Sequence, residues 1–304
     1  MTNADGTTRN KDYRWRCRGC KQMFSVRTNT IFEESRLPLR VWVFAFWRAA
    51  ASKKGCSALE LAREMEMSHK SALFVLRRIR HGLGTNDDAP KFTGTIEADE
   101  TYMGGKPRRA QHAKGYGRRP YSRGAADKPA VMGVVERGGD VRFRLLDRVT
   151  ADRLGHFIAE NADLSCRLIT DDHQGYKGVG EAFEGGHESV KHSQWEYAKP
   201  GTDIHSNTIE GVFSLIKRGV MGTFHSISRK HIPNYLNEFE FRWNTRKMDD
   251  GERVAKAIKQ VDGKRLQYRE SVDNPPYLVP EWKWVVQPKA PSIDWSKPRP
   301  EKPE

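Results

Sequence analysis

Hydrophobic residues recur at helical spacing soon after the polar beginning of the chain. Pro38 stands where a proline can open a helix, and Val41, Phe44, Trp47 and Ala51 follow at intervals of three or four residues. This periodicity predicts a buried helix.

Two shorter helical segments come next. Ser57 is a suitable N-cap for the segment ALELAREM, and a turn at residues 66–67 separates it from a second segment that Ser68 caps. The second segment has one apolar face, formed by Ala72, Val75, Leu76 and Ile79. Together they predict a helix-turn-helix. Its second helix ends in cationic groups suited to DNA phosphates, Arg77, Arg78 and Arg80.

A different pattern begins after residue 90. The segments TGTIEADE, AVMGVVER and VRFRLLD predict strands, and residues 138–140 predict the turn of a hairpin between the last two. A helix over 151–161 and a fourth strand, CRLIT, follow, and further helices are predicted over 207–219 and 228–247. This order is typical of an α/β domain with a mixed sheet.

Breaker-rich and proline-rich stretches suggest the domain boundaries. GTNDDAP at residues 84–90 favours a linker, and eight of the 15 prolines fall from Pro275 onward, which predicts an extended tail. We therefore expect a basic N-terminal segment (1–35), a helical module (36–84), an α/β domain (91–250) and a C-terminal extension with Pro and Trp (251–304).

The charge of the chain favours nucleic acid as its partner. Lys and Arg number 53 against 39 Asp and Glu, a formal net charge of +14. The longest apolar run, Val41 to Trp47, is far below the roughly 20 residues that span a bilayer, and the N-terminus resembles no secretory signal. These features predict a cytoplasmic protein that associates with the nucleoid when it is bound to DNA.

The most basic stretch lies between the first two predicted strands. Residues 106–128 hold eight Lys or Arg and one Asp, which predicts a flexible loop over about 104–128. Tyr116 and Tyr121 lie among the charges and suit contacts with DNA, although a merely solubilising insertion is the alternative. The predicted DNA-binding residues here are Arg108, Arg109, Arg118 and Arg119.

Three carboxylates are the candidate catalytic groups. Asp99 and Asp171 each end a predicted strand, and the ends of neighbouring strands converge at one edge of a sheet. Glu210 shares a helix face with Lys217, which would lie near the DNA backbone beside Arg218. Oxygen ligands without His or Cys suit Mg²⁺ or Mn²⁺, and two such ions about 4 Å apart can stabilise an in-line phosphoryl displacement.

A structural interpretation of the same residues stands beside this one. Aspartates often end strands because they favour turns, and Glu210 with Lys217 could form an ordinary solvated helix face. Spacing alone leaves both interpretations open.

The sequences of three segments resemble those of a known family. IEADETYMGGK, LITDDHQGY and HSNTIEGVFSLIKRGVMGTFHSISRKHIPNYLNEFEFRWNTR are similar, in this order, to bacterial insertion-sequence transposases with an ISXO-like catalytic domain. The resemblance covers roughly residues 15–247. It implies an RNase H-like fold, a divalent-metal DDE site, binding of terminal inverted repeats, and DNA strand cleavage and transfer by at least a dimer on double-stranded DNA.

The resemblance also assigns the acidic residues. It makes Asp99 the first acid, not Glu97 or Glu100, and Asp171 the second. Glu210 is the third acid, because Lys217 follows it seven residues later, at the spacing that DDE enzymes favour. Some family members use an asparagine at this point, so Asn207 is the alternate.

The family typically begins with a zinc ribbon of two Cys-x-x-Cys pairs, and this chain supplies only Cys17 and Cys20. Because structural zinc needs four ligands, the pair is expected to be a partial zinc ribbon. Thiols without metal are the favoured interpretation, and Zn²⁺ binding is the alternative. Cys56 and Cys166 lie beside apolar segments and are expected to be structural.

Other functions are compatible with the same residues. His173, His192 and His205 could touch DNA, although surface or core positions are the commoner outcome for histidine. A domesticated, non-catalytic DNA-binding regulator using the helix-turn-helix is the alternative function, and a repair or resolvase nuclease on the same fold is a third.

Overall fold

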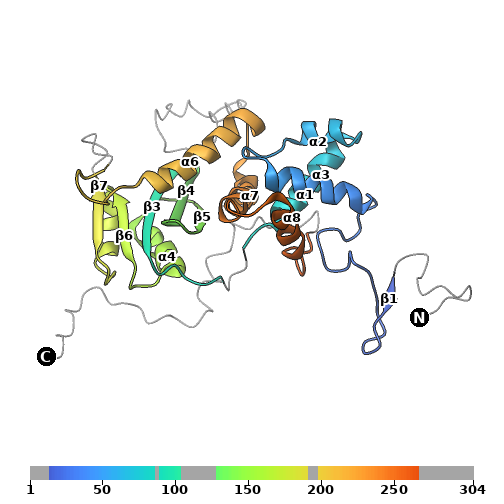
Figure 1. Cartoon of the computed structure of the whole chain (residues 1–304), viewed down its shortest axis with the longest axis horizontal. Helices are drawn as coiled ribbons and strands as arrows, with labels where there is room; N and C mark the ends of the chain where they lie inside the picture. Colours follow the sequence, from blue (N-terminus) through green and yellow to red (C-terminus); the bar gives the residue numbers. More distant parts are fainter. Residues whose placement is uncertain (1–13, 86–88, 104–127, 191–197, 267–304) are drawn as a thin grey trace, which may run out of the picture. The chain divides into compact units, whose positions relative to one another are not determined.

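The computed structural model describes residues 14–85, 89–103, 128–190 and 198–266, all within one compact unit that comprises residues 1–266 (Figure 1). The basic loop, His192 and the tail from Gln267 lie outside the described residues. No helix in the described part is both long and apolar enough to cross a membrane.

A five-stranded mixed sheet forms the centre of the α/β region (Figure 1). In the order β5-β4-β3-β6-β7, β4 is antiparallel to both of its neighbours, β6 is parallel to β3 and β7 is parallel to β6. The strands are β3 (Thr95–Tyr102), β4 (Ala130–Glu136), β5 (Val141–Leu146), β6 (Arg167–Asp171) and β7 (His187–Val190). This confirms the predicted mixed α/β class, and β7 is a strand that the sequence pattern did not predict.

Helices cover both faces of this sheet because its strands are apolar on both sides. α4 (Ala151–Asn161) packs on one face through Leu154, Phe157 and Ile158, with Ile96 and Ala98 of β3 in the same core. α6 (Asn207–Gly219) and α7 (Ile232–Asn244) form a second core with Val131 and Val135 of β4.

Alternation along β3 decides which of its side chains face α6. Ile96 and Ala98 belong to the α4 core, whereas Glu97 and Asp99 are paired with Val135 and Gly133. Because side chains alternate between the two faces of a strand, Glu97 and Asp99 both lie on the α6 side of the sheet.

The N-terminal helices share a core with the end of the described chain. α1 (Leu39–Ala51), α2 (Ala58–Glu64) and α3 (His69–Gly82) pack with Phe241 of α7 and Ala257 of α8 (Asp250–Lys259). Ser57 and Ser68 cap α2 and α3, as predicted. The role of this pair as a DNA-binding helix-turn-helix remains a prediction.

The helix α1 is buried on one face only, and of the four residues that suggested a buried helix only Val41 is buried. Trp47 is 42% exposed and Phe44 is only partly buried, whereas the inner face carries Trp42, Ala45, Phe46 and Ala49. Both faces of this helix are apolar, so periodicity could not distinguish the one that packs against α3 and α8.

Short elements complete the described chain: β1 (Trp15–Arg16), β2 (Met23–Phe24), α5 (Lys177–Gly180), the 3₁₀ turns η2 (Gln174–Tyr176) and η5 (Arg229–His231), and the π-helix η4 (Val220–Phe224). β1 and β2 form a small antiparallel pair around the Cys17–Cys20 turn.

Candidate active site

Three carboxylates converge where the pairing of β3 with β6 ends. β6 ends at Asp171, but β3 continues past Asp99 to Tyr102, which corrects the prediction that Asp99 ends its strand. Asp99, Glu100 and Asp171 each offer an oxygen, and these oxygens lie within 4.8 Å of one another. Ala98 is paired with Thr170 in the parallel ladder, so the next residue on each strand is an aspartate on the α6 side. Within the described residues, no other group of His, Cys, Asp and Glu meets this condition for holding a metal ion.

Burial, together with crowding among these acids, raises the pKa of Asp99 to about 7. Burial is the largest cause, followed by the charges of Asp171 and Glu100, with a smaller contribution from Glu210. A cation bound here would offset this repulsion, and three oxygen donors match the preference of Mg²⁺ and Mn²⁺. The residues therefore fit a hard divalent cation.

Glu100 is a member of the cluster that the sequence did not indicate. It accepts a hydrogen bond from the Tyr176 hydroxyl at 2.6 Å, and His173 Nδ1 lies 3.9 Å from its other oxygen. Burial raises the pKa of Glu100. Its partners come from the turn after β6, which brings His173 to the edge of the site. No spacing in the sequence relates residue 100 to residue 176.

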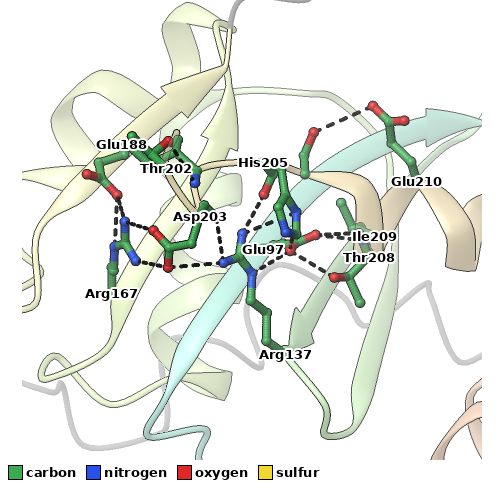
Figure 2. A network of polar contacts seen from close by, with 12 residues as sticks. Glu97, Arg137, Arg167, Glu188, Thr202, Asp203, His205, Thr208, Ile209 and Glu210 are labelled. Atoms are coloured by element: carbon green, nitrogen blue, oxygen red, sulfur yellow. Dashed lines mark hydrogen bonds and ion pairs between the residues drawn. The ribbon is translucent and has the colours of Figure 1, made fainter. Parts of the chain in front are cut away.

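Glu210 approaches the cluster from α6 without belonging to it. Its side chain is half-buried and accepts a hydrogen bond from Ser206 Oγ at 3.5 Å (Figure 2). Asn207, the first residue of the helix, is exposed. Glu210 contributes to the electrostatic environment of Asp99, and Asn207 remains the alternate third ligand.

Glu97 lies on the same face of β3 and is fully enclosed by hydrogen-bond donors. It accepts from the Thr208 and Ile209 amides and from Arg137, and His205 Nδ1 lies 3.4 Å away (Figure 2). His205 is therefore part of a packed polar network beside the start of α6.

Two of the arginines predicted to contact DNA are buried. Arg80 is 1% exposed and pairs with Glu238, and Arg78 is 7% exposed and donates to the carbonyls of Ile31 and Glu33. Their guanidiniums bind groups inside the protein, which corrects the prediction that they bind phosphates. Charge alone could not show which side of α3 packs inward.

Arg77, Lys217 and Arg218 lie nearer the surface. Arg77 is half-buried, with Nη2 3.2 Å from His231 Nε2, whereas Lys217 and Arg218 are exposed near the end of α6. Arg108, Arg109, Arg118 and Arg119 lie outside the described residues, so their predicted contacts stay predictions.

The cysteine pair lies in the turn between β1 and β2. Hydrogen bonds from Cys20 and Gly19 lower the pKa of Cys17. Within the described part of the chain, neither thiol belongs to a group of three metal-ligating side chains, so zinc binding remains a prediction. Cys56 and Cys166 are buried, as expected of structural thiols.

Comparison with known proteins identifies relatives of the chain. Residues 91–244 match the family described as the ISXO2-like transposase domain. An uncharacterised protein in transposable element ISH50 of Halobacterium salinarum is 30% identical over 236 residues, which cover 75% of this chain and 78% of that protein.

Two solved structures show more distant similarity. The Mos1 transposase paired-end complex with left transposon end has 15% identity and a TM-score of 0.28, covering 77% of this chain and 82% of that one. The Mos1 mariner paired end complex with Mn has 14% identity and a TM-score of 0.29, covering 76% and 80%.

Proposed function

This chain belongs to the ISXO2-like transposase family, and we propose that it cleaves and joins DNA strands at the ends of an insertion sequence. The observation that carries the proposal is the convergence of Asp99 and Asp171 at the point where the parallel pairing of β3 with β6 ends. The domain is RNase H-like in this proposal, and its DDE site lies on the α6 face of the sheet.

Asp99 and Asp171 would hold Mg²⁺ or Mn²⁺ with a third residue from α6, either Glu210 or Asn207. A pair of such cations supplies charge stabilisation to the attacking and leaving oxygens of an in-line displacement at phosphorus. The carboxylates would bind and orient the cations, and Glu100 adds negative charge beside Asp99 and Asp171. The number of ions, two per site, is part of the proposal.

The DNA backbone would approach from the exposed end of α6. Lys217 lies seven residues beyond Glu210, which is two helical turns, and Lys217 and Arg218 are both exposed. Exposed cationic side chains on the same helix as Glu210 suit the phosphates of the DNA backbone. Arg77 and the four arginines of the basic loop complete the proposed DNA-binding set, and at least two copies assemble on the paired ends.

The test uses duplex DNA that carries the inverted repeats flanking the reading frame. Wild-type protein should nick it only with Mg²⁺ or Mn²⁺, and Asp99→Asn and Asp171→Asn should abolish nicking while a gel-shift assay shows unchanged binding. Asp172→Asn is the matched control, because Asp172 is exposed and lies outside the acidic cluster. Nicking that survives in both cluster variants would falsify the assignment. Specific binding without any metal-dependent product would favour the non-catalytic regulator.

A further inference from the structure

The N-terminus of α6 lacks a local cap. A typical N-cap side chain accepts hydrogen bonds from the amides two or three residues into the helix, but Ser206 at this position makes no such bond. The Thr208 and Ile209 amides instead donate to Glu97 Oε2 at 2.8 and 3.0 Å. The Thr208 hydroxyl donates to Glu97 Oε1 at 2.9 Å. A carboxylate of β3 therefore caps the helix, at the end where the helix dipole favours negative charge.

Arg137 extends this contact to the segment that leads into α6. Its Nε donates to Glu97 Oε1 at 2.7 Å, and its two Nη atoms donate to the carbonyls of Asp203 and His205 at 2.7 and 2.8 Å (Figure 2). Glu97 is 0% exposed. The same ion pair thus fixes the beginning of the helix and the residues immediately before it.

The contact lies between the proposed ligands on both elements. Glu97 and Asp99 are two residues apart on one face of β3. Thr208 and Ile209 lie between Asn207 and Glu210, the two candidates for the third ligand. The distance from Asp99 to either candidate is therefore set through the Glu97 carboxylate.

We infer that Glu97 is the positioning residue of the active site: by capping α6 from β3, it holds the third metal ligand opposite Asp99 and Asp171. This inference rests on the proposed function. Glu97 is not itself a ligand, because its oxygens are already bound by the amides of α6, the Thr208 hydroxyl and Arg137.

The contact requires a carboxylate at position 97. All the partners are donors, and a carboxylate is an acceptor only. A glutamine has one acceptor oxygen, so its NH₂ group would face either the Thr208 and Ile209 amides or Arg137. Glu97→Gln should therefore break one side of the contact and loosen the start of α6 while it keeps the size of the side chain.

Glu238→Gln is the matched control. Glu238 is also 0% exposed and binds two arginines, but it lies on α7 and interacts with Arg80 and Arg242 instead of with α6. Both variants lose a buried charge, so a loss of activity caused by lower stability alone would affect both.

The experiment compares wild type, Glu97→Gln and Glu238→Gln at a temperature where circular dichroism shows all three folded. Misplacement of a catalytic group by about 1 Å can cost about 100-fold in rate. We expect Glu97→Gln to lower kcat for Mn²⁺-dependent nicking by about this factor, with KM for the DNA end nearly unchanged. Amide exchange at Thr208 and Ile209 should rise at least about tenfold, as expected for a locally opened helix end. Glu238→Gln should change neither quantity.

Two results would overturn the inference: kcat and amide exchange like those of wild type in Glu97→Gln, or an equal loss of kcat in both variants. Failure of the proposed function is a separate result, because it would appear as wild-type protein without metal-dependent nicking. The inference would then be decided by amide exchange, and unchanged protection of Thr208 and Ile209 in Glu97→Gln would overturn it.

Discussion

Gly133 lies opposite Asp99 in the β3–β4 ladder, at a point where Ile209 and Phe213 of α6 pack closely against the strand. A Cβ atom on Gly133 would lie 2.9 Å from Ile209 Cδ1 and 3.0 Å from Phe213 Cζ. The absence of a side chain beside Asp99 therefore allows α6 to pack against the strand pair.

Gly133→Ala should destabilise the protein because Ile209 and Phe213 would have to move. Overpacking of this kind costs about 1–3 kcal/mol in the free energy of unfolding, measured in urea. Gly211→Ala is the control on the outer side of α6, where a new Cβ meets nothing within 4 Å. It should stabilise the helix by about 0.5–1 kcal/mol. Equal effects of the two substitutions would contradict this description of the interface.

The identity of the third ligand can be tested within α6. Glu210→Gln should lower metal-dependent nicking more than about 100-fold, since loss of an outer partner of a metal ligand already costs about 10- to 100-fold. Asn207→Ala should retain most activity, because Asn207 is exposed. An inactive Asn207→Ala with a merely impaired Glu210→Gln would assign the role to Asn207 instead.

Glu240, which lies outside the acidic cluster, should make the stability of the protein depend on pH. It accepts hydrogen bonds from the Phe143 amide and the Thr85 hydroxyl, and burial raises its pKa from 4.5 to about 7. Between these values the folded state holds a proton that the unfolded state has lost, so the free energy of unfolding falls as pH rises through this window.

Glu240→Gln should remove that dependence. The variant should match wild type near pH 5 and exceed it near pH 8 by up to about 3 kcal/mol, the free energy that corresponds to the pKa shift. Urea titrations at the two pH values measure the difference. A difference that does not change between them would show that Glu240 titrates normally.

The buried ion pairs of Glu238 should be important for stability. Arg80 of α3 and Arg242 of α7 both bind it, and none of the three side chains is more than 6% exposed. Glu238→Ala should cost about 3–5 kcal/mol, because it leaves buried arginines without a counter-charge. Asp147→Ala breaks the exposed pair with Arg153 and should cost no more than about 1 kcal/mol. Comparable costs would be inconsistent with the burial of the first group.

The thiols should differ in reactivity. Hydrogen bonding lowers the pKa of Cys17, whereas burial raises that of Cys56 to about 12. In the folded protein near pH 7.5, iodoacetamide should modify Cys17 and leave Cys56 and Cys166 unmodified, as read by peptide mass spectrometry. Protection of Cys17 by added Zn²⁺ would show that the partial ribbon binds zinc.

Several elements could be predicted from the sequence because their signals are local. The limits predicted for the helices at 151–161 and 207–219 agree with α4 and α6, and the caps Ser57 and Ser68 are at the predicted places. Asp99 and Asp171 could be paired because each follows an apolar run that predicts a strand end, although β3 in fact continues to Tyr102 and only its pairing with β6 ends beside Asp99. β7 and α8 could not be recognised, since one is short and the other is mostly polar.

The sequence by itself determined the α/β class and the pairing of Asp99 with Asp171, because hydrophobic periodicity and strand-end position are properties of neighbouring residues. Only the tertiary structure decided that Arg80 and Arg78 are buried, that Glu100 joins the acidic cluster, and that Glu97 caps α6. These roles depend on contacts between residues far apart in the chain. The sequence gives the identity of an arginine or a glutamate but not its surroundings, and only the packing around it decides whether it binds DNA, a metal ion or the backbone of a helix.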